Sequence, residues 1–414
     1  MSRSDSPSAV HALPSYDTNR RARTAALACM IGLAVALGVG RFAFTPLLPL
    51  MLADGSIGLK AGSWLASANY AGYFVGAVSC AALRVAPARM VRFGLAATVL
   101  LAAAMGVGHL LPLWLAVRFA AGVVSAWTFV FVSQWGLRRL VELHASEWSG
   151  VIYTGPGVGI VLTGLIGSAL AGHRAAPGWL GFAALSAVLS VVIWRTFAVT
   201  SPAGELSSGA APHAAAIAAP TSVRGQRADA AWLVVLYGMP GFGYIITATF
   251  LPVIARAVLP AGSPWPDLFW PMFGAALIVG ALSAARLPGH WDNRLLLALG
   301  CATQALGIAV GIVWPNAAGF SVGSALLGLP FTAITLFAMR EARRLHGERA
   351  AGLMGYATAS YGIGQIAGPL VAAPLVARYG SFTPALWLAA AALLAGAAGF
   401  AAIAVDGAYR RART

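Results

Sequence analysis

The run at residues 24–50, TAALACMIGLAVALGVGRFAFTPLLPL, decides the fold, because it contains a single charged residue, Arg41. About 20 consecutive apolar residues are enough to cross the hydrocarbon core of a bilayer as an α-helix. Similar runs recur to the end of the chain, at 62–83, 90–110, 112–138, 148–171, 177–199, 230–255, 266–286, 294–313, 316–340, 350–376 and 382–404. The sequence therefore predicts an all-α membrane protein with about twelve transmembrane helices.

The composition excludes an ordinary soluble protein. Of the 414 residues, 59% are hydrophobic and 9% are charged, whereas globular domains carry about 25% charged residues. So few charges could not cover the surface of a water-soluble core. The apolar runs are also continuous rather than alternating, which favours helices over a transmembrane β-barrel.

The net charge of +15 predicts a topology rather than a nucleic-acid partner. With the N-terminus inside, the inner loops and tails hold 21 of the 27 basic residues, and the outer loops hold 4. The remaining two, Arg41 and Arg118, lie within predicted helices. Because an excess of Lys and Arg marks the cytoplasmic side of a membrane, we expect both termini in the cytoplasm.

The chain repeats itself in two halves. Gly38-Val-Gly40-Arg41 corresponds to Gly241-Phe-Gly243-Tyr244 at a shift of 203, and 75–79 corresponds to 279–283 at a shift of 204. This shift spans six predicted helices, so the two halves form a parallel repeat. The Ala-, Ser- and Pro-rich segment between them has no apolar period and reads as a linker. We expect the following parts: a tail at 1–23, a six-helix bundle at 24–199, a cytoplasmic linker at 200–228, a second bundle at 229–405 and a tail at 406–414.

With these features the sequence resembles the major facilitator superfamily of transporters. Arg118 followed by Gly122 resembles the fourth-helix motif of that superfamily, and Gly155-Pro156 and the segment Gly364–Pro369 resemble its Gly-Pro kinks. The first-helix string from Gly38 to Pro49 is similar to the YbfB/YjiJ-type branch, a set of bacterial transporters. The resemblance implies two six-helix bundles around a central cavity, in a multi-pass protein of the bacterial cytoplasmic membrane.

The resemblance also implies residues with gating or structural roles. These are the kink residues Gly155, Pro156, Gly368 and Pro369, and the pair Asp292 and Arg294 in the loop between the eighth and ninth predicted helices. The superfamily usually carries an acid and glycines in the loop between its second and third helices, but residues 84–92 contain neither. The inner gate is therefore expected to be latched differently in the two halves.

Two arginines within the predicted spans are the leading candidates for substrate binding. An uncompensated arginine inside a bilayer costs at least about 2.5–3.5 kcal/mol, so each must find a compensating contact. Counted from the outer helix ends, Arg41 is about 13 Å deep and Arg118 is about 9 Å deep. Two guanidinium groups that face one cavity without a carboxylate favour an anionic substrate. The alternatives are that Arg118 caps backbone carbonyls in a kinked helix and that Arg41 extends outward to the interface.

Other polar and aromatic residues on the predicted cavity helices are weaker candidates, since each alone more often joins helices than binds a ligand. They are Asn69, Tyr73, Trp127, Gln134, Tyr153, Tyr237, Tyr244, Thr247, Tyr361 and Gln365. Tyr244 stands at the repeat position of Arg41, so we expect a charged first half and a neutral, aromatic second half. Such a site suits a solute with one anionic end.

The function that this reading favours is secondary active transport of a small organic anion by alternating access, with a proton as a possible coupling ion and a monomer as the working unit. The alternatives are a drug or metabolite efflux pump and a membrane sensor or assembly protein that moves nothing. We expect no enzyme, cofactor or metal site, because the sequence contains no nucleophile–base pair, no zinc-binding HExxH string and no phosphate-binding loop. The three cysteines lie in apolar runs without metal-ligand spacing.

Overall fold

The computed structural model describes residues 16–198, 223–347 and 350–412, and within these ranges it contains helices and no strand. The helices are α1 (Tyr16–Leu33), η1 (Ala34–Phe42), α2 (Phe44–Ala53), α3 (Leu59–Ser79), η2 (Cys80–Ala82), α4 (Pro87–Val107), α5 (Leu111–Glu142), η3 (Ser146–Trp148), α6 (Ser149–Ile152), α7 (Gly155–Ala169), α8 (Ala175–Trp194), α9 (Val223–Val258), α10 (Trp265–Arg286), α11 (Asn293–Val313), α12 (Ala317–Gly328), α13 (Phe331–His346), α14 (Ala350–Tyr379) and α15 (Thr383–Ala412).

In the described ranges, eleven helical stretches are long and apolar enough to cross a membrane. The helix α3 falls short of this criterion, although it has the length of a span, because it carries Lys60 and several buried polar residues such as Ser63 and Asn69. It lies between two qualifying stretches and packs along α5 and α14. Counting α3, the described ranges contain the twelve membrane helices that the apolar runs predict.

Several helices extend past the boundaries drawn from hydropathy. The helix α1 begins at Tyr16 inside the expected tail, α9 begins at Val223 inside the expected linker, and α15 continues to Ala412 through the expected tail. The apolar runs mark where lipid contact ends, but a helix continues into water as long as its backbone hydrogen bonds are satisfied along its own axis. The rest of the expected linker, up to residue 222, lies outside the described residues.

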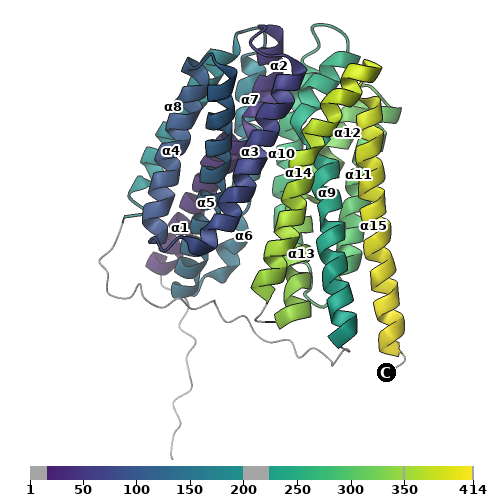
Figure 1. The fold of residues 1–414 in the computed structure, drawn as a ribbon. Helices are drawn as coiled ribbons and strands as arrows, with labels where there is room; N and C mark the ends of the chain where they lie inside the picture. The colour runs from purple at the N-terminus through teal and green to yellow at the C-terminus, as the bar shows by residue number, and fades with distance from the viewer. Residues whose placement is uncertain (1–15, 199–222, 348–349, 413–414) are drawn as a thin grey trace, which may run out of the picture.

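The helices pack as two bundles with the same internal plan (Figure 1). In the first half α4 packs along α8, and in the second half the equivalent α11 packs along α15. Likewise η1 packs on α7 in the first half, as α9 packs on α14 in the second. The start of α1 and the end of α15 lie on the same face of the molecule, at the bottom of Figure 1. We call this the terminal face.

The first membrane helix changes its winding at its centre. Between α1 and α2, the nine-residue segment η1 is a π-helix, a form that usually occurs as a single turn at functional sites. At Gly38 this segment crosses α7 so closely that an added Cβ atom would lie 2.4 Å from the Cα atom of Gly159. The equivalent crossing in the second half, α9 on α14, uses Gly241 and Gly364. Glycine is required at these crossings because the two backbones touch.

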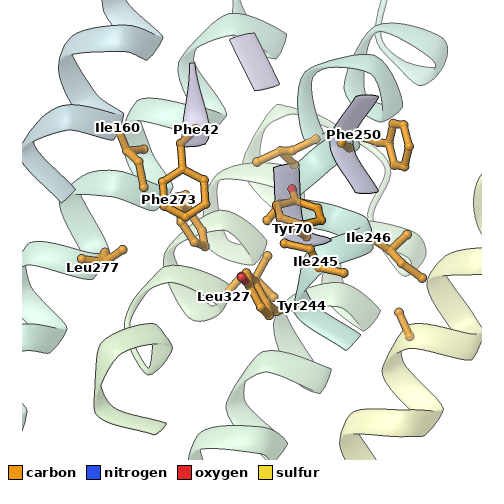
Figure 2. Packing of buried hydrophobic residues seen from close by; sticks show 14 of the residues in the cluster. Phe42, Tyr70, Ile160, Tyr244, Ile245, Ile246, Phe250, Phe273, Leu277 and Leu327 are labelled. Carbon is orange, nitrogen blue, oxygen red and sulfur yellow. The ribbon is translucent and has the colours of Figure 1, made fainter. Parts of the chain in front are cut away.

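The buried core continues from one half into the other. Figure 2 shows Phe42 of η1 and Tyr70 of α3 beside Tyr244 of α9 and Phe273 of α10, and all four belong to one cluster of buried side chains. The helices α7 and α10 also pack along each other, with Gly164 against Pro271. The contact between the halves is therefore a packed apolar surface with a few polar groups set into it.

Candidate functional site

Arg41, in the last turn of η1, lies at the centre of the contact between the halves. Its side chain is buried, with 5% of the residue exposed. The guanidinium carbon lies 3.9 Å from the centre of the Tyr73 ring and 5.3 Å from that of Tyr70, both on α3. Cation–π contacts of this kind compensate part of the cost of a buried charge. Arg41 forms no ion pair with any carboxylate of the described chain, and its Nε atom has no hydrogen-bond partner.

A single side chain links Arg41 to the second half. The Nη2 atom of Arg41 donates to Oε1 of Gln365 on α14, at 2.8 Å. The Nε2 atom of Gln365 in turn donates to the hydroxyl of Tyr244 on α9. The candidates Arg41, Gln365 and Tyr244 thus form one buried chain of hydrogen bonds that crosses from the first half to the second.

Aromatic rings surround this chain on the side of the second half. The Tyr361 ring stacks on Tyr244 with centroids 5.9 Å apart and on Tyr237 with centroids 4.8 Å apart. Phe331 of α13 packs edge-on against Tyr244 at 5.0 Å and against Phe42 at 6.2 Å. The second half therefore contributes neutral aromatic groups to the site.

Sequence reasoning missed several members of this cluster. Tyr70 lies three residues before Tyr73, on the same face of α3, and its hydroxyl lies 2.9 Å from Oγ1 of Thr249. The helical spacing of Tyr70 and Tyr73 was the signal that could have found it. Trp270 of α10 lies 6.0 Å from Phe42 between ring centres. Phe331 and Trp270 carry no such signal, because an aromatic residue in an apolar run looks like any other core residue.

Arg118 and Asn69 hold the backbone around Arg41. The Nη2 atom of Arg118 donates to the carbonyl oxygen of Arg41 at 3.2 Å, and its guanidinium lies over the Phe44 ring at 4.9 Å. The Nδ2 atom of Asn69 donates to the carbonyl oxygens of Gly40, at 3.2 Å, and of Arg118, at 2.9 Å. The expectation of two arginines facing one cavity differs from this arrangement, since Arg118 points at a backbone carbonyl, as the capping alternative described.

Hydrogen bonds between the halves gather on the side of Arg41 that is away from the terminal face. Thr45 donates to the carbonyl oxygen of Ala248 at 3.0 Å, and Ser67 donates to that of Ile366 at 2.9 Å. Toward the terminal face, α6 contacts α10, where Gly150 lies near Ala285. No comparable packing joins α5 or α6 to α13 or α14 within the described ranges, and the lower ends of α6 and α13 stand apart in Figure 1. The halves are therefore joined tightly at one end of the molecule.

Four other candidates lie apart from Arg41. The Tyr153 ring packs near Phe129, with centroids 6.4 Å apart, and Gln134 is exposed on α5. The indole nitrogen of Trp127 donates to Oγ of Ser79 at 2.9 Å. Thr247 lies inside the second half, with its hydroxyl buried and unpartnered. The structure does not bring these four into contact with Arg41.

The Gly-Pro pairs lie where helices of the same half pack together. Gly155 and Pro156 start α7, whereas the sequence placed Pro156 inside a continuous helix. The fifth helix is interrupted at Tyr153 and Thr154, because proline fits the first turn of a helix better than its interior. Gly368 packs against Ile245 of α9, and Pro369 lies within α14.

Asp292 and Arg294 form a tight pair at the terminal face of the second half. Asp292 caps α11 by accepting from the Arg294 backbone N–H at 2.9 Å, and its carboxylate accepts from Nε at 3.0 Å and Nη2 at 2.8 Å. Burial raises the pKa of Asp292, but the hydrogen bonds from Arg294 outweigh it and leave this pKa below its usual value. Arg294 also donates to the carbonyl oxygen of Ile403 on α15 at 3.0 Å, and it lies 3.8 Å from Glu341 of α13. The pair thus ties together helices of one half.

The first half treats the equivalent arginine differently. Arg92, at a shift of 202 from Arg294, donates to the carbonyl oxygen of Trp194 on α8 through Nε at 3.3 Å and Nη2 at 3.1 Å. No described carboxylate pairs with it. An arginine therefore joins α4 to α8 in the first half and α11 to α15 in the second half. Of these two arginines, Arg294 alone also belongs to an ionic network.

No group of three potential metal ligands occurs in the described ranges. The arrangement around Arg41 offers a buried cation with neutral hydrogen-bonding and aromatic neighbours, at the contact between two similar bundles. Such a place can bind an anionic or polar group and is shaped by how the halves meet.

Comparison with known proteins agrees with this architecture. A point mutant of the nucleoside transporter NupG, a solved crystal structure, is similar to the chain with a TM-score of 0.65 and 16% sequence identity, over 92% of this chain and 99% of that one. At this identity the likeness shows the fold alone. No curated protein matches the sequence. The family model described as "Uncharacterised MFS-type transporter YbfB" matches residues 33–400. Because that match spans most of the sequence, the chain belongs to the YbfB-type family of major facilitator superfamily transporters.

Proposed function

We propose that this transporter is a secondary active carrier of a small organic anion, and that Arg41 binds the anionic group. The observation that carries the proposal is the state of Arg41. Its guanidinium is buried at the contact between the halves, and its hydrogen-bond partner is a neutral amide, Gln365. A buried charge without a counter-charge binds an anion strongly, because both partners gain from the low local dielectric.

The neighbours of Arg41 suit an anion with an apolar body. The planar guanidinium can hold a carboxylate through two parallel hydrogen bonds once Gln365 moves aside. Tyr73 lies directly beside the guanidinium, and the stacked rings of Tyr244 and Tyr361 continue from Gln365. These rings would contact the uncharged part of the solute, while Asn69 and Arg118 would position Arg41 without touching it.

Alternating access is supported by the uneven contact between the halves. Beyond Arg41, Thr45 and Ser67 join the halves by hydrogen bonds, while the helices nearer the terminal face are not packed across the gap in the same way. The route would therefore be closed at the end away from the terminal face and would open toward the terminal face. Rocking of the two bundles about the site would close the route at the terminal face and open it at the opposite end.

The setting of the protein completes the proposal. The excess of basic residues on the terminal side supports a cytoplasmic location for both termini. We propose that the protein works as a monomer in the bacterial inner membrane. A gradient would supply the energy. The carboxylates of the described chain lie near helix ends, as Asp54 and Glu341 do. A coupling proton would therefore be carried by such a group or by the solute.

The test is counterflow of labelled carboxylates in proteoliposomes, with solutes chosen by a thermal-shift screen of the purified protein. Arg41→Ala should abolish uptake with insertion and yield unchanged, and Arg41→Lys should retain a fraction of it, because lysine keeps the charge but loses the fork. Arg378→Ala removes an exposed arginine at the end of α14 and serves as the control.

Three results would overturn the proposal. Normal uptake by Arg41→Ala would remove this residue from the site. Efflux of cationic dyes without carboxylate counterflow would make the protein a drug pump, and the absence of any flux across a broad set of solutes would favour a sensor or assembly role.

A further inference from the structure

A small, partly open cavity lies inside the first half, apart from the contact between the bundles. It has a volume of about 10 Å³ and is lined by residues of η1, α4, α5 and α8. Because this volume counts only where the centre of a small particle can lie, the space can hold one water molecule or one monatomic ion. Its lining is mostly apolar, with three side chains that carry polar groups: Thr98, Arg118 and Trp179.

Two of these three side chains carry hydrogen-bond donors with no acceptor. The Nε atom of Arg118 and the Nε1 atom of Trp179 are both buried, and neither has a hydrogen-bond partner. The two residues are each 2% exposed. The hydroxyl of Thr98 already donates to the carbonyl oxygen of Gly94 at 2.8 Å. Because a buried N–H without an acceptor costs about 1–3 kcal/mol, two of them beside one cavity indicate that something in it accepts hydrogen bonds.

The charge of Arg118 indicates what the occupant is. The partners of its guanidinium are a backbone carbonyl and the Phe44 ring, and neither carries a negative charge. The nearby Arg41 adds a second positive charge, since its own carbonyl is the group that Arg118 binds. Water would accept both hydrogen bonds but would leave the charge of Arg118 uncompensated, whereas an anion satisfies the two donors and that charge together.

We propose that this cavity is a binding site for a single halide ion, chloride or bromide, held by Nε of Arg118 and Nε1 of Trp179. A monatomic anion fits the small volume, and as a pure acceptor it matches the two free donors. The ion would stabilise Arg118 in the position that holds the backbone of Arg41. It is distinct from the transported solute, because every residue that lines the cavity belongs to the first half.

The test compares purified protein in chloride with protein in gluconate at equal ionic strength. The melting temperature should rise with chloride in a saturable way, by about 1 °C once chloride is about fivefold above its dissociation constant. Trp179→Phe, which loses the indole N–H and keeps most of the ring volume, should abolish this rise. Trp114→Phe is the matched control, because the indole of Trp114 donates to the carbonyl oxygen of Met105 at 3.1 Å.

Two further readouts make the result decisive. Arg41→Ala should keep the chloride-dependent rise, which separates this site from the proposed substrate site. Crystals grown in bromide should show an anomalous peak between Arg118 and Trp179. A chloride response that survives in Trp179→Phe, no response in the unaltered protein, or density there without an anomalous signal would each overturn the proposal, and the last would identify a water.

Discussion

Arg41 and Tyr244 occupy equivalent positions in the two halves, 203 residues apart, and Gln365 joins them by accepting from the first and donating to the second. The duplicated sequence has thus placed a charged and a neutral side chain at equivalent places in the two bundles. One amide can serve both because it carries a donor and an acceptor. The site is therefore asymmetric in chemistry although the bundles that form it share one plan.

Replacing the bridging amide by an acid should block anion transport. In Gln365→Glu the new carboxylate would sit beside Arg41 and compete with the solute, so counterflow of the labelled anion should fall by about tenfold or more. Gln365→Met has a similar length and no charge, and it should retain more uptake than the acid. Equal counterflow rates in the two variants would show that the solute does not bind to the guanidinium of Arg41.

Asn69 should act on stability rather than on substrate affinity. Its side chain is fully buried and joins α3 to Gly40 and to Arg118. Asn69→Ala should lower the free energy of unfolding by about 0.6–1.7 kcal/mol, from the average to the largest value measured for a hydrogen bond between membrane helices. Denaturation in mild detergent would give this value, and the KM for the transported anion should stay unchanged. A raised KM with unchanged stability would instead make Asn69 a substrate contact.

The crossing of η1 and α7 should not tolerate a side chain. Gly38→Ala would place a Cβ atom 2.4 Å from the Cα atom of Gly159, and a backbone cannot move aside as a flexible side chain can. We expect a loss of about 1–3 kcal/mol in stability and a reduced yield of folded protein. Gly181→Ala on α8 is the control, because a Cβ atom there meets nothing within 4 Å. Similar melting temperatures for the two variants would contradict the close crossing.

Acid should weaken the second half through Asp292. Its pKa in the folded protein is lowered, mainly by the hydrogen bonds from Arg294 acting against burial, so its contribution to stability is full above the unfolded value of about 3.9 and is lost as the pH falls below it. Asp292→Asn should be less stable at pH 7 by about 0.5–2 kcal/mol, the usual effect of losing a helix cap. Its melting temperature should then fall less than that of the unaltered protein between pH 5 and pH 3, and parallel acid profiles would count against this role.

The sequence predicted the fold well because lipid leaves the backbone few choices. Long apolar runs must be helices in a bilayer, and the shift between Gly38 and Gly241 revealed the repeat before any packing was known. Helix ends were less predictable. The helix α15 continues to Ala412 because hydropathy reports contact with lipid, whereas helix length depends on the backbone. The interruption before Gly155 follows from Pro156 in the first turn of α7, which the apolar pattern alone does not register.

The candidate site was predictable in part. Arg41 was conspicuous because a charge inside an apolar run requires a partner, and the repeat led from it to Tyr244. The direction of a side chain was not predictable, since Arg118 lies at a similar depth but donates to the backbone of the neighbouring helix. The roles of Phe331 and Trp270 could be recognised only in the structure, where both rings pack against Phe42 of the opposite half. An aromatic residue in an apolar run does not indicate which side chains it contacts.

The winding of η1 links Arg41 to the junction of the bundles. A π-helix takes more residues into each turn than an α-helix, so a return of these nine residues to α-helical bonding would swing Arg41 around the axis and push α2 outward. Thr45, four residues later, is the donor to Ala248 across the junction. A solute bound to the guanidinium would therefore act on the winding of η1. A change of this segment to α-helix would move Thr45 away from Ala248 and loosen the contact with the opposite bundle.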